Sequence, residues 1–437
     1  MTLNGLDLGE GSHTLSVRAA NPLPWMPDVL LERQFTVDNT PPTVSVDLVE
    51  AKSPRGPLTV RGTADGASTV LVGDQRVDVR DGRFEALLSS VPARLRLEAS
   101  DEAGNTGHHD VAVKVPHPGM RAVHMSAAAW ATAELREPVL ALAREGRIDT
   151  VQLDIKDESG EIGYDSQVPL AKEVGASRNH YDARATVDQL HGMNLRVVGR
   201  LVAFRDPVLA KASWQAGAQD RVARNQGGAP WTGHYGEYAF TNFANPEVRD
   251  YNIAIAREAV TLGFDDILYD YVRRPDGPIG QMLFAGLAGT PEQSIVDFMR
   301  DTREVIRPLG AYLGASVFGI AAHSGTDIAQ DIPAMSAYVD YLSPMVYPSH
   351  WGPGEYGVDH PEGKPYDIVR ASVADFVALT KDTGATVIPW LQAFSMAHSY
   401  GPAEVQAQVK ASADAGAQSF LLWNAACRYE SAGLAPG

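Results

Sequence analysis

The sequence predicts an α/β architecture, a (β/α)8 TIM barrel that follows an N-terminal all-β sandwich. Up to about Pro116, short segments alternate apolar and polar residues and are separated by Gly, Pro, Asn and Asp, a pattern typical of a β-sandwich. After residue 118, apolar strands alternate with amphipathic helices, which indicates parallel β/α units. The length agrees, because 437 residues suffice for about three folding units.

The chain is expected to divide into residues 1–39, 40–117 and 118–437. The second segment has enough alternating strands for one complete sandwich, whereas the first supplies only the closing strands of another. A half-sandwich would leave an apolar face and a strand edge unpaired. We therefore expect that the chain begins inside a longer extracellular protein, or was shortened, or that residues 1–39 pack onto the next module.

Eight apolar segments after residue 118 are expected to form the barrel strands. They are Arg121–Ser126, Thr150–Asp157, Leu195–Ala203, Asp266–Val272, Tyr312–Phe318, Tyr341–Tyr347, Thr386–Gln392 and Gln418–Asn424. Several of the helical stretches between them open with Pro, whose missing N–H costs nothing in the first turn. Eight such units over about 320 residues predict a TIM barrel. A doubly wound open sheet is the alternative, but it requires a Gly-rich phosphate loop after the first strand, and residues 125–129 are not such a loop.

The composition excludes several classes of protein. The chain has 37 Lys and Arg against 54 Asp and Glu, a net charge of −17, and no Lys/Arg-rich run, so nucleic acid is not an expected partner. No stretch approaches the roughly 18–20 apolar residues that cross a bilayer, so no membrane span is expected, and Met1–Gly11 lacks the pattern of a signal peptide. The single cysteine, Cys427, forbids an internal disulfide and is expected to be buried and inert.

Active sites of TIM barrels lie at the C-terminal ends of the strands, and here those ends are unusually polar. The first four strands offer His124, Asp154, Lys156, Arg200 and Asp270. The later strands end in Tyr347, Trp390, Gln392, Trp423 and Asn424. Branched apolar residues normally fill such a barrel, and a buried charge needs a partner. This group is therefore expected to bind substrate, and the alternative is an ion-pair network that only holds the barrel together.

Asp270 is the strongest candidate for a catalytic carboxylate. It ends the fourth strand between two tyrosines, and a carboxylate held ionised by Lys156 or Arg200 is a competent nucleophile or charge stabiliser at an electron-poor carbon. Cleavage of a glycosidic bond needs a second carboxyl group to protonate the leaving oxygen. The fifth and seventh strands end without one, which argues against barrel glycosidases that pair glutamates on strands four and seven.

The second acid is expected on strand two, as Asp154 or Asp157, or in a loop, as Asp206, Glu355 or Asp359. Glu355 is favoured, because residues 347–357 form a loop rich in glycine and aromatic residues at the correct end of the barrel. That loop also carries two further candidates for substrate binding, His350 and Trp351.

Aromatic residues near the expected mouth suit a carbohydrate, because the C–H faces of sugar rings stack on apolar planes. They are Trp231, Tyr235, Tyr271, Tyr347, Trp351, Trp390 and Trp423. Metal chemistry has weaker support, since the sequence contains no H-E-x-x-H motif and no Cys/His cluster. A serine hydrolase is weaker still, because no G-x-S-x-G elbow occurs. No metal and no other cofactor is therefore expected.

Two regions resemble known families. Residues 37–44 and 99–105 resemble the linker and late hairpin of bacterial immunoglobulin-like surface modules, so the sandwich is expected to be immunoglobulin-like. From Met125 to about Tyr429, the motifs resemble a bacterial family of TIM-barrel, glycosyl hydrolase-like domains of unknown function. These motifs are Leu153–Gly160, Tyr164–Ser166, Arg200–Pro207, Tyr269–Arg273, Ser343–His350, Pro389–Gln392 and Leu421–Asn424. Members often carry an acidic residue before Val-Phe-Gly on strand five, where this chain has Ser316.

The resemblance implies a carbohydrate substrate, a bacterial surface polysaccharide or exopolysaccharide, and it assigns no catalytic pair. The function expected is a secreted or surface-attached glycoside hydrolase, whose immunoglobulin-like region serves as a spacer or cell-surface docking platform. The alternatives are a non-catalytic polysaccharide-binding or adhesion protein on a barrel scaffold, which Ser316 favours, and a metal-dependent deacetylase.

Overall fold

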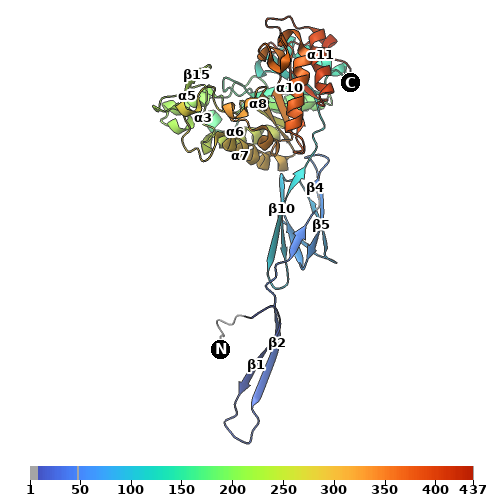
Figure 1. Cartoon of the computed structure of the whole chain (residues 1–437), viewed down its shortest axis with the longest axis vertical. Coiled ribbons are helices and arrows are strands. Elements are labelled where there is room, and N and C mark those ends of the chain that lie inside the picture. The colour runs from blue at the N-terminus through green and yellow to red at the C-terminus, as the bar shows by residue number, and fades with distance from the viewer. Residues whose placement is uncertain (1–7, 47–48, 437) are drawn as a thin grey trace. The chain divides into compact units, whose positions relative to one another are not determined.

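The computed structural model describes residues 8–46 and 49–436 and divides the chain into two compact units. The first unit consists of residues up to 50, 57–89 and 94–114, and the second of residues 51–56, 90–93 and 115–437. The first unit begins with a hairpin of β1 (Gly11–Ala19) and β2 (Val29–Val37), paired antiparallel along their whole length (Figure 1). Most side chains of this hairpin are exposed.

Two antiparallel sheets follow the hairpin within the described residues, as expected for a β-sandwich. One sheet has the order β3 (Thr43–Ser45), β5 (Leu58–Asp65), β8 (Arg83–Leu88). The other has the order β4 (Val49–Glu50), β10 (Thr106–Lys114), β9 (Arg94–Ser100), β6 (Thr69–Val72), β7 (Gln75–Asp78), in which only β4 pairs parallel. Nearly every second residue of β5 and β9, such as Val60, Leu95 and Leu97, is buried, because one face of each sheet forms the core.

The second unit is a closed parallel barrel. Its strands in the described residues are β11 (Arg121–Met125), β12 (Thr150–Lys156), β13 (Arg196–Val202), β17 (Asp266–Asp270), β19 (Tyr312–Phe318), β20 (Tyr341–Met345), β21 (Thr386–Val387), β22 (Trp390–Gln392) and β23 (Phe420–Trp423). They pair in chain order, β21 and β22 are two pieces of the seventh strand, and β23 closes the ring on β11. The predicted fold class, a TIM barrel after an all-β region, is confirmed.

Helices surround the barrel strands, as the alternating sequence pattern predicts (Figure 1). They are α1 (Ala127–Ala131), α2 (Ala133–Arg144), α3 (Pro169–Glu173), α4 (Ala183–His191), α5 (Pro207–Gln215), α6 (Pro246–Thr261), α7 (Pro291–Ile306), α8 (Ala321–Ser324), α9 (Ile332–Ser336), α10 (Pro365–Leu379) and α11 (Pro402–Asp414). Five of the longer ones, α5, α6, α7, α10 and α11, begin with Pro. Side-chain caps fix α5, α6 and α7 through Asp206, Asn245 and Thr290.

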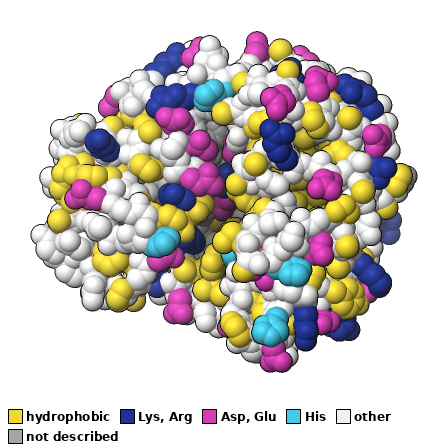
Figure 2. All heavy atoms as spheres, turned by 90° about the horizontal axis from the view of Figure 1, so that it is seen from above, with side chains coloured by type: hydrophobic (Ala, Val, Ile, Leu, Met, Phe, Trp, Pro, Cys, Tyr) yellow, Lys and Arg dark blue, Asp and Glu magenta, His cyan; other side chains and the backbone are white. Residues whose placement is uncertain are grey.

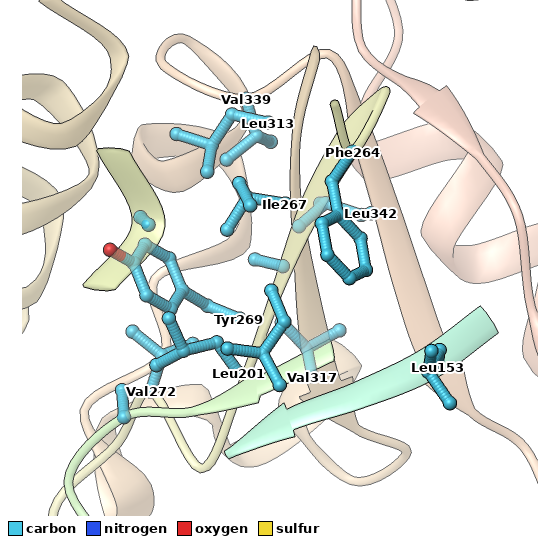
Figure 3. Close-up of a cluster of buried hydrophobic side chains, with 14 of the residues drawn as sticks. Leu153, Leu201, Phe264, Ile267, Tyr269, Val272, Leu313, Val317, Val339 and Leu342 are labelled. Atoms are coloured by element: carbon cyan, nitrogen blue, oxygen red, sulfur yellow. The ribbon is translucent and has the colours of Figure 1, made fainter. Parts of the chain in front are cut away.

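The two faces of each barrel strand have different surroundings. Leu153, Leu201, Ile267, Tyr269 and Leu313 point outward and form the apolar layer between strands and helices (Figure 3). The intervening residues point into the barrel, and near the C-terminal ends of the strands they are polar. The alternation of a strand therefore places the candidate site residues together at one end of the barrel.

Candidate active site

Arg200 on β13 lies at the centre of a buried cluster of charges. Its Nε and Nη2 donate to Oδ2 of Asp270 on β17 at 2.9 and 2.6 Å, and its Nη1 donates to Oδ1 of Asp154 on β12 at 3.1 Å. Its Nη2 also donates to Oε1 of Glu158, which follows β12. Burial alone would lower the pKa of Arg200, but the charges of Glu158, Asp270 and Asp154 outweigh it and hold that pKa above its usual value.

His124 on β11 completes the cluster from the other side of Asp154. Its Nε2 lies 3.1 Å from both carboxylate oxygens of Asp154, and its ring stacks on Trp423 with centroids 4.1 Å apart. Burial lowers the pKa of His124, but Asp154 more than compensates and raises the pKa to about 9. His124 is therefore a cation at neutral pH. Cys427 is buried beside it, as expected, and accepts a weak hydrogen bond from the backbone N–H of Ser126 at 3.4 Å.

Asp270 is held by its own backbone as well as by Arg200. The N–H of Tyr271 donates to Oδ1 of Asp270 at 2.7 Å, and Tyr271 has a φ of 47°, which an L-residue rarely adopts. Asp270 also borders a cavity of about 270 Å³. The cavity is lined by Tyr235, Asp270, Tyr271, Arg273, Phe318, Gln330, Met345 and His350. One carboxylate thus faces both a guanidinium and an open space.

Glu158 is a member of the cluster that the sequence reasoning did not single out. Its side chain is 30% exposed, so it is the most accessible of the three carboxylates bound to Arg200. Burial raises its pKa, but the charge of Arg200, its hydrogen bond and a backbone hydrogen bond together outweigh burial and leave that pKa below the usual value. The sequence feature that could have identified Glu158 is its place in the motif Leu153–Gly160, two residues after the end of the second strand.

Lys156 does not join this cluster, and the expectation that it lies beside Asp270 is wrong. A β-bulge between Asp154 and Lys156 inserts one residue into β12, so Lys156 pairs with Leu201 and points outward. Its ammonium donates to Asp206 at 2.7 Å and to Asn252 on α6 at 2.8 Å, and its side chain is fully buried. Burial lowers the pKa of Lys156, and Asp206 opposes that shift.

The other two predicted catalytic acids take different positions. Asp157 is half-buried in the turn after β12, where its Oδ1 accepts hydrogen bonds from Ser159 N, Ser159 Oγ and Glu161 N at 2.9, 2.5 and 3.2 Å. Burial is the main cause of its raised pKa. Glu355 lies on an exposed 3₁₀ turn, Glu355–Gly357, and is not among the residues that line the cavity beside Asp270. The structure therefore brings Glu158, not Glu355, to Asp270.

Two predicted tryptophans form an apolar wall next to the charges. Trp390 on β22 and Trp423 on β23 pack edge to face with centroids 5.7 Å apart, and Arg200 lies 5.1 Å from the Trp423 ring. The indole N–H of Trp390 donates to Ser316 Oγ at 2.9 Å. Ser316 is thus a buried support for Trp390.

The other residues predicted to bind substrate divide into two groups. Tyr347 and His350 pack together 4.9 Å apart on the side of Asp270, where burial and then the charge of Asp270 raise the pKa of Tyr347, and burial lowers that of His350. The remaining three hold loops in place. Gln392 accepts from Ser349 N and donates to Phe394 O, Asn424 donates to Ala393 O and Arg428 O, and Trp351 packs against Tyr356.

The surface around the barrel carries charges of both signs. In the face shown in Figure 2, basic side chains are scattered, and acidic side chains gather around a hollow near its centre. Among the described residues, none of the helices is both long and apolar enough to cross a bilayer, and no group of three or more His, Cys, Asp or Glu is arranged to hold a metal ion.

One of the solved structures similar to this chain supports the barrel fold. The glycoside hydrolase domain of PgaB (BpsB) from Bordetella bronchiseptica superposes with a TM-score of 0.53 at 13% identity, over 71% of this chain and 95% of that one. A hypothetical protein from Ruminiclostridium thermocellum is 29% identical, with a TM-score of 0.40, over 44% of this chain and 96% of that one. An endo-1,4-β-D-mannanase from Thermotoga petrophila has a TM-score of 0.45 at 11% identity, over 70% and 88% of the two chains. No curated protein matches the sequence.

A family model identifies the barrel unit more directly than these distant folds. The model described as "Putative glycosyl hydrolase domain" matches residues 122–429, from the first barrel strand to the loop after the last one. The match includes all the residues that surround Arg200. The chain therefore belongs to this family of glycosyl hydrolase-like barrels.

Proposed function

We propose that the protein is a glycoside hydrolase that cleaves a bacterial surface or extracellular polysaccharide, with Asp270 and Glu158 as its two catalytic carboxylates. One observation carries the proposal: both carboxylates accept a hydrogen bond from the same Nη2 atom of Arg200, and Asp270 also lines an open cavity. Glycoside hydrolysis requires such a pair of carboxyl groups on either side of the scissile bond.

The shared nitrogen limits the separation of the two groups. Two oxygens that accept charge-assisted hydrogen bonds from one nitrogen lie less than about 6 Å apart. Retaining glycosidases place their carboxyl groups about 5–5.5 Å apart, whereas inverting enzymes need about 6.5–9.5 Å to admit a water molecule. The arrangement of Asp270 and Glu158 thus favours retention of configuration at the anomeric carbon.

In the first step, an oxygen of Asp270 bonds to the anomeric carbon while the glycosidic C–O bond breaks, and Glu158 gives its proton to the leaving oxygen. In the second step, Glu158 takes a proton from water, whose oxygen attacks the anomeric carbon and releases Asp270. Asp270 suits the nucleophile because Arg200 and the N–H of Tyr271 fix both of its oxygens.

Glu158 suits the proton donor because it is the most accessible of the three carboxylates bound to Arg200. Burial and the charge of Asp154 raise its pKa, whereas the charge and hydrogen bond of Arg200 and a backbone hydrogen bond lower it. A bound glycan removes the remaining water from a side chain that is 30% exposed, which disfavours the charged form. Glu158 then carries its proton beside the leaving oxygen of the bound glycan.

The neighbouring side chains suit the remaining contacts with a sugar. His124 is charged and Trp423 is flat, and they lie next to each other beside Asp154. Tyr347 and His350 present a hydroxyl and a neutral imidazole on the side of Asp270. Sugar hydroxyls meet such polar groups, while the C–H faces of a ring stack on tryptophan.

The decisive experiment compares four variants in the release of reducing ends from a panel of bacterial exopolysaccharides. We expect Asp270→Asn to lose at least about a thousandfold of rate. Glu158→Gln should lose about 10²–10⁴-fold on polysaccharide but much less on a nitrophenyl glycoside of the same sugar, whose leaving group needs no proton. Asp157→Asn and Glu355→Gln are the matched controls and should remain near wild type. A selective loss of activity on polysaccharide in Asp157→Asn or Glu355→Gln would assign the proton donor to that residue instead of Glu158. Full activity in Asp270→Asn would refute the proposal.

A second function has support from one observation. The family resemblance leads us to expect an acid on strand five, but this chain has Ser316 there, which is buried and accepts a hydrogen bond from Trp390. A barrel that binds polysaccharide without cleaving it would tolerate that change. Glycan binding by the wild-type chain with no reducing ends released would favour this adhesion function. In either case we propose an extracellular or cell-surface location, with the sandwich as a docking region.

A further inference from the structure

The β-sandwich has a concave surface lined by four arginines, which we name the arginine groove. It encloses about 930 Å³ and is lined by Arg61, Gly62, Thr63, Arg76, Val77, Asp78, Arg80, Arg83, Phe84 and Glu85. Ligand sites of proteins commonly have volumes of about 300–1,000 Å³. All of these residues belong to the first compact unit, so the groove is independent of the barrel site.

The strand pairing explains why the arginines converge. Arg80 and Arg83 flank a two-residue turn, Asp81–Gly82, in which both residues have positive φ, and their backbones exchange hydrogen bonds of 2.9 and 3.0 Å. Residues directly opposite each other in this way point to the same face, with Cβ atoms about 4.5–5.5 Å apart. The turn therefore places the Cβ atoms of two arginines next to each other on one face.

Most of this positive charge has no partner in the protein. Arg61 forms two hydrogen bonds with Glu85, at 3.1 and 2.9 Å, so its charge is balanced. Arg76, Arg80 and Arg83 are exposed and have no ion-pair partner within the described residues. Like charges placed directly opposite each other on a sheet are destabilising, which makes an external anion the natural partner. The protein as a whole carries a net charge of −17, so this concentration of positive charge is not a general property of its surface.

The geometry points to a second carbohydrate-binding site in the arginine groove, specific for a polysaccharide that carries carboxylate groups. Guanidinium forks bind planar carboxylates through two parallel hydrogen bonds. Asp78 and Glu85 lie among the arginines and repel a polymer with closely spaced charges, such as a nucleic acid. A uronic-acid polymer has one charge per sugar or fewer, and its hydroxyls can bond to Asp78, Glu85 and Thr63. The choice of a glycan rests on the proposed function, but binding in the groove requires no catalysis.

The test measures binding of fluorescent oligogalacturonate to the full chain carrying Asp270→Asn, so that hydrolysis does not interfere. Arg76→Gln/Arg80→Gln/Arg83→Gln should weaken binding at least about tenfold. The matched control is Arg94→Gln/Arg96→Gln on β9, two exposed arginines that share Asp110 at 3.8 and 3.5 Å, and it should bind within about twofold of the parent. Binding should also weaken as salt is raised from about 50 to 300 mM.

Several results would overturn the inference. They are no binding of oligogalacturonate at millimolar concentration, equal binding by the two arginine variants, and tighter binding of neutral dextran or single-stranded DNA than of oligogalacturonate. Circular dichroism of the triple variant tests whether it is folded, which we expect because the three side chains are exposed. If the barrel proves inactive on every polysaccharide, the binding result still stands or falls by itself.

Discussion

Replacement of Arg200 by methionine tests whether one guanidinium holds the charge cluster together. Methionine has a similar length and removes the positive charge, so Asp154, Glu158 and Asp270 remain together without it. Breaking a buried ion pair by removing one partner costs about 3–5 kcal/mol. In a unit of this size each kcal/mol corresponds to about 2 °C, so Tm should fall by about 6–10 °C.

The loss should depend on pH in a defined direction. In the wild-type protein the pKa of Glu158 is below its usual value, so its contribution to stability is present above the unfolded pKa of about 4.3 and is lost as the pH falls below it. Without Arg200, burial and the charge of Asp154 raise that pKa, so the variant loses stability as the pH rises above about 4.3. The difference in Tm should therefore grow between about pH 4 and pH 7.

Thermal unfolding followed by circular dichroism at several pH values measures both effects. Arg144→Met is the matched control in the same unit, because Arg144 pairs with Glu137 at 3.3 Å and both side chains are more than half exposed. Such surface pairs contribute about 0.2–1 kcal/mol, so Tm should fall by about 2 °C or less. Equal shifts in the two variants, or a shift in Arg200→Met that does not change with pH, would refute the reasoning.

Three further predictions concern the barrel. His124 has a pKa of about 9, so its contribution to stability is complete below about pH 6.5 and is lost as the pH rises to 9. The stability of His124→Gln should therefore not fall between pH 6.5 and 9 as that of the wild type does. An equal fall in the variant would contradict the assignment of this loss of stability to His124. Lys156→Met leaves Asp206 buried without its cation and should lower the free energy of unfolding, measured with denaturant, by about 3–5 kcal/mol. The double variant Lys156→Met/Asp206→Asn should regain part of this free energy. If it regains none, the ion pair is not the cause of the loss. Gly314→Ala places a Cβ 2.3 Å from the Tyr341 ring and should destabilise by about 1–3 kcal/mol, whereas an unchanged midpoint would mean that the ring moves freely.

The sequence alone predicted the barrel because its signal is repeated. Each strand is apolar on the side that meets the helices, so eight independent segments each predicted a β/α unit. The observed strands agree with the predicted ones to within a few residues. The convergence of His124, Asp154, Arg200 and Asp270 followed from the same rule, because strand ends of a parallel barrel meet at one opening.

What the sequence could not provide were local departures from regular geometry. The bulge in β12 reverses the direction of Lys156, and nothing in the alternating pattern signals the extra residue. Glu158 and Glu355 both lie in loops rich in glycine or short polar residues, and only the folded turn shows that Glu158 reaches Arg200. Loop side chains have no periodicity from which their direction can be read.

The outward-pointing side chain of Lys156 connects neighbouring β/α units through its hydrogen bonds. Its ammonium reaches from β12 to Asp206 at the start of α5 and to Asn252 in α6. Gly160, two residues after Glu158, lies so close to Asp206 that a Cβ there would come within 2.2 Å of its carboxylate. TIM barrels acquire new specificities by exchanging loops one at a time. If the loop that carries Glu158 were moved into another barrel, it would keep its position only if Lys156, Asp206 and Asn252 were moved with it.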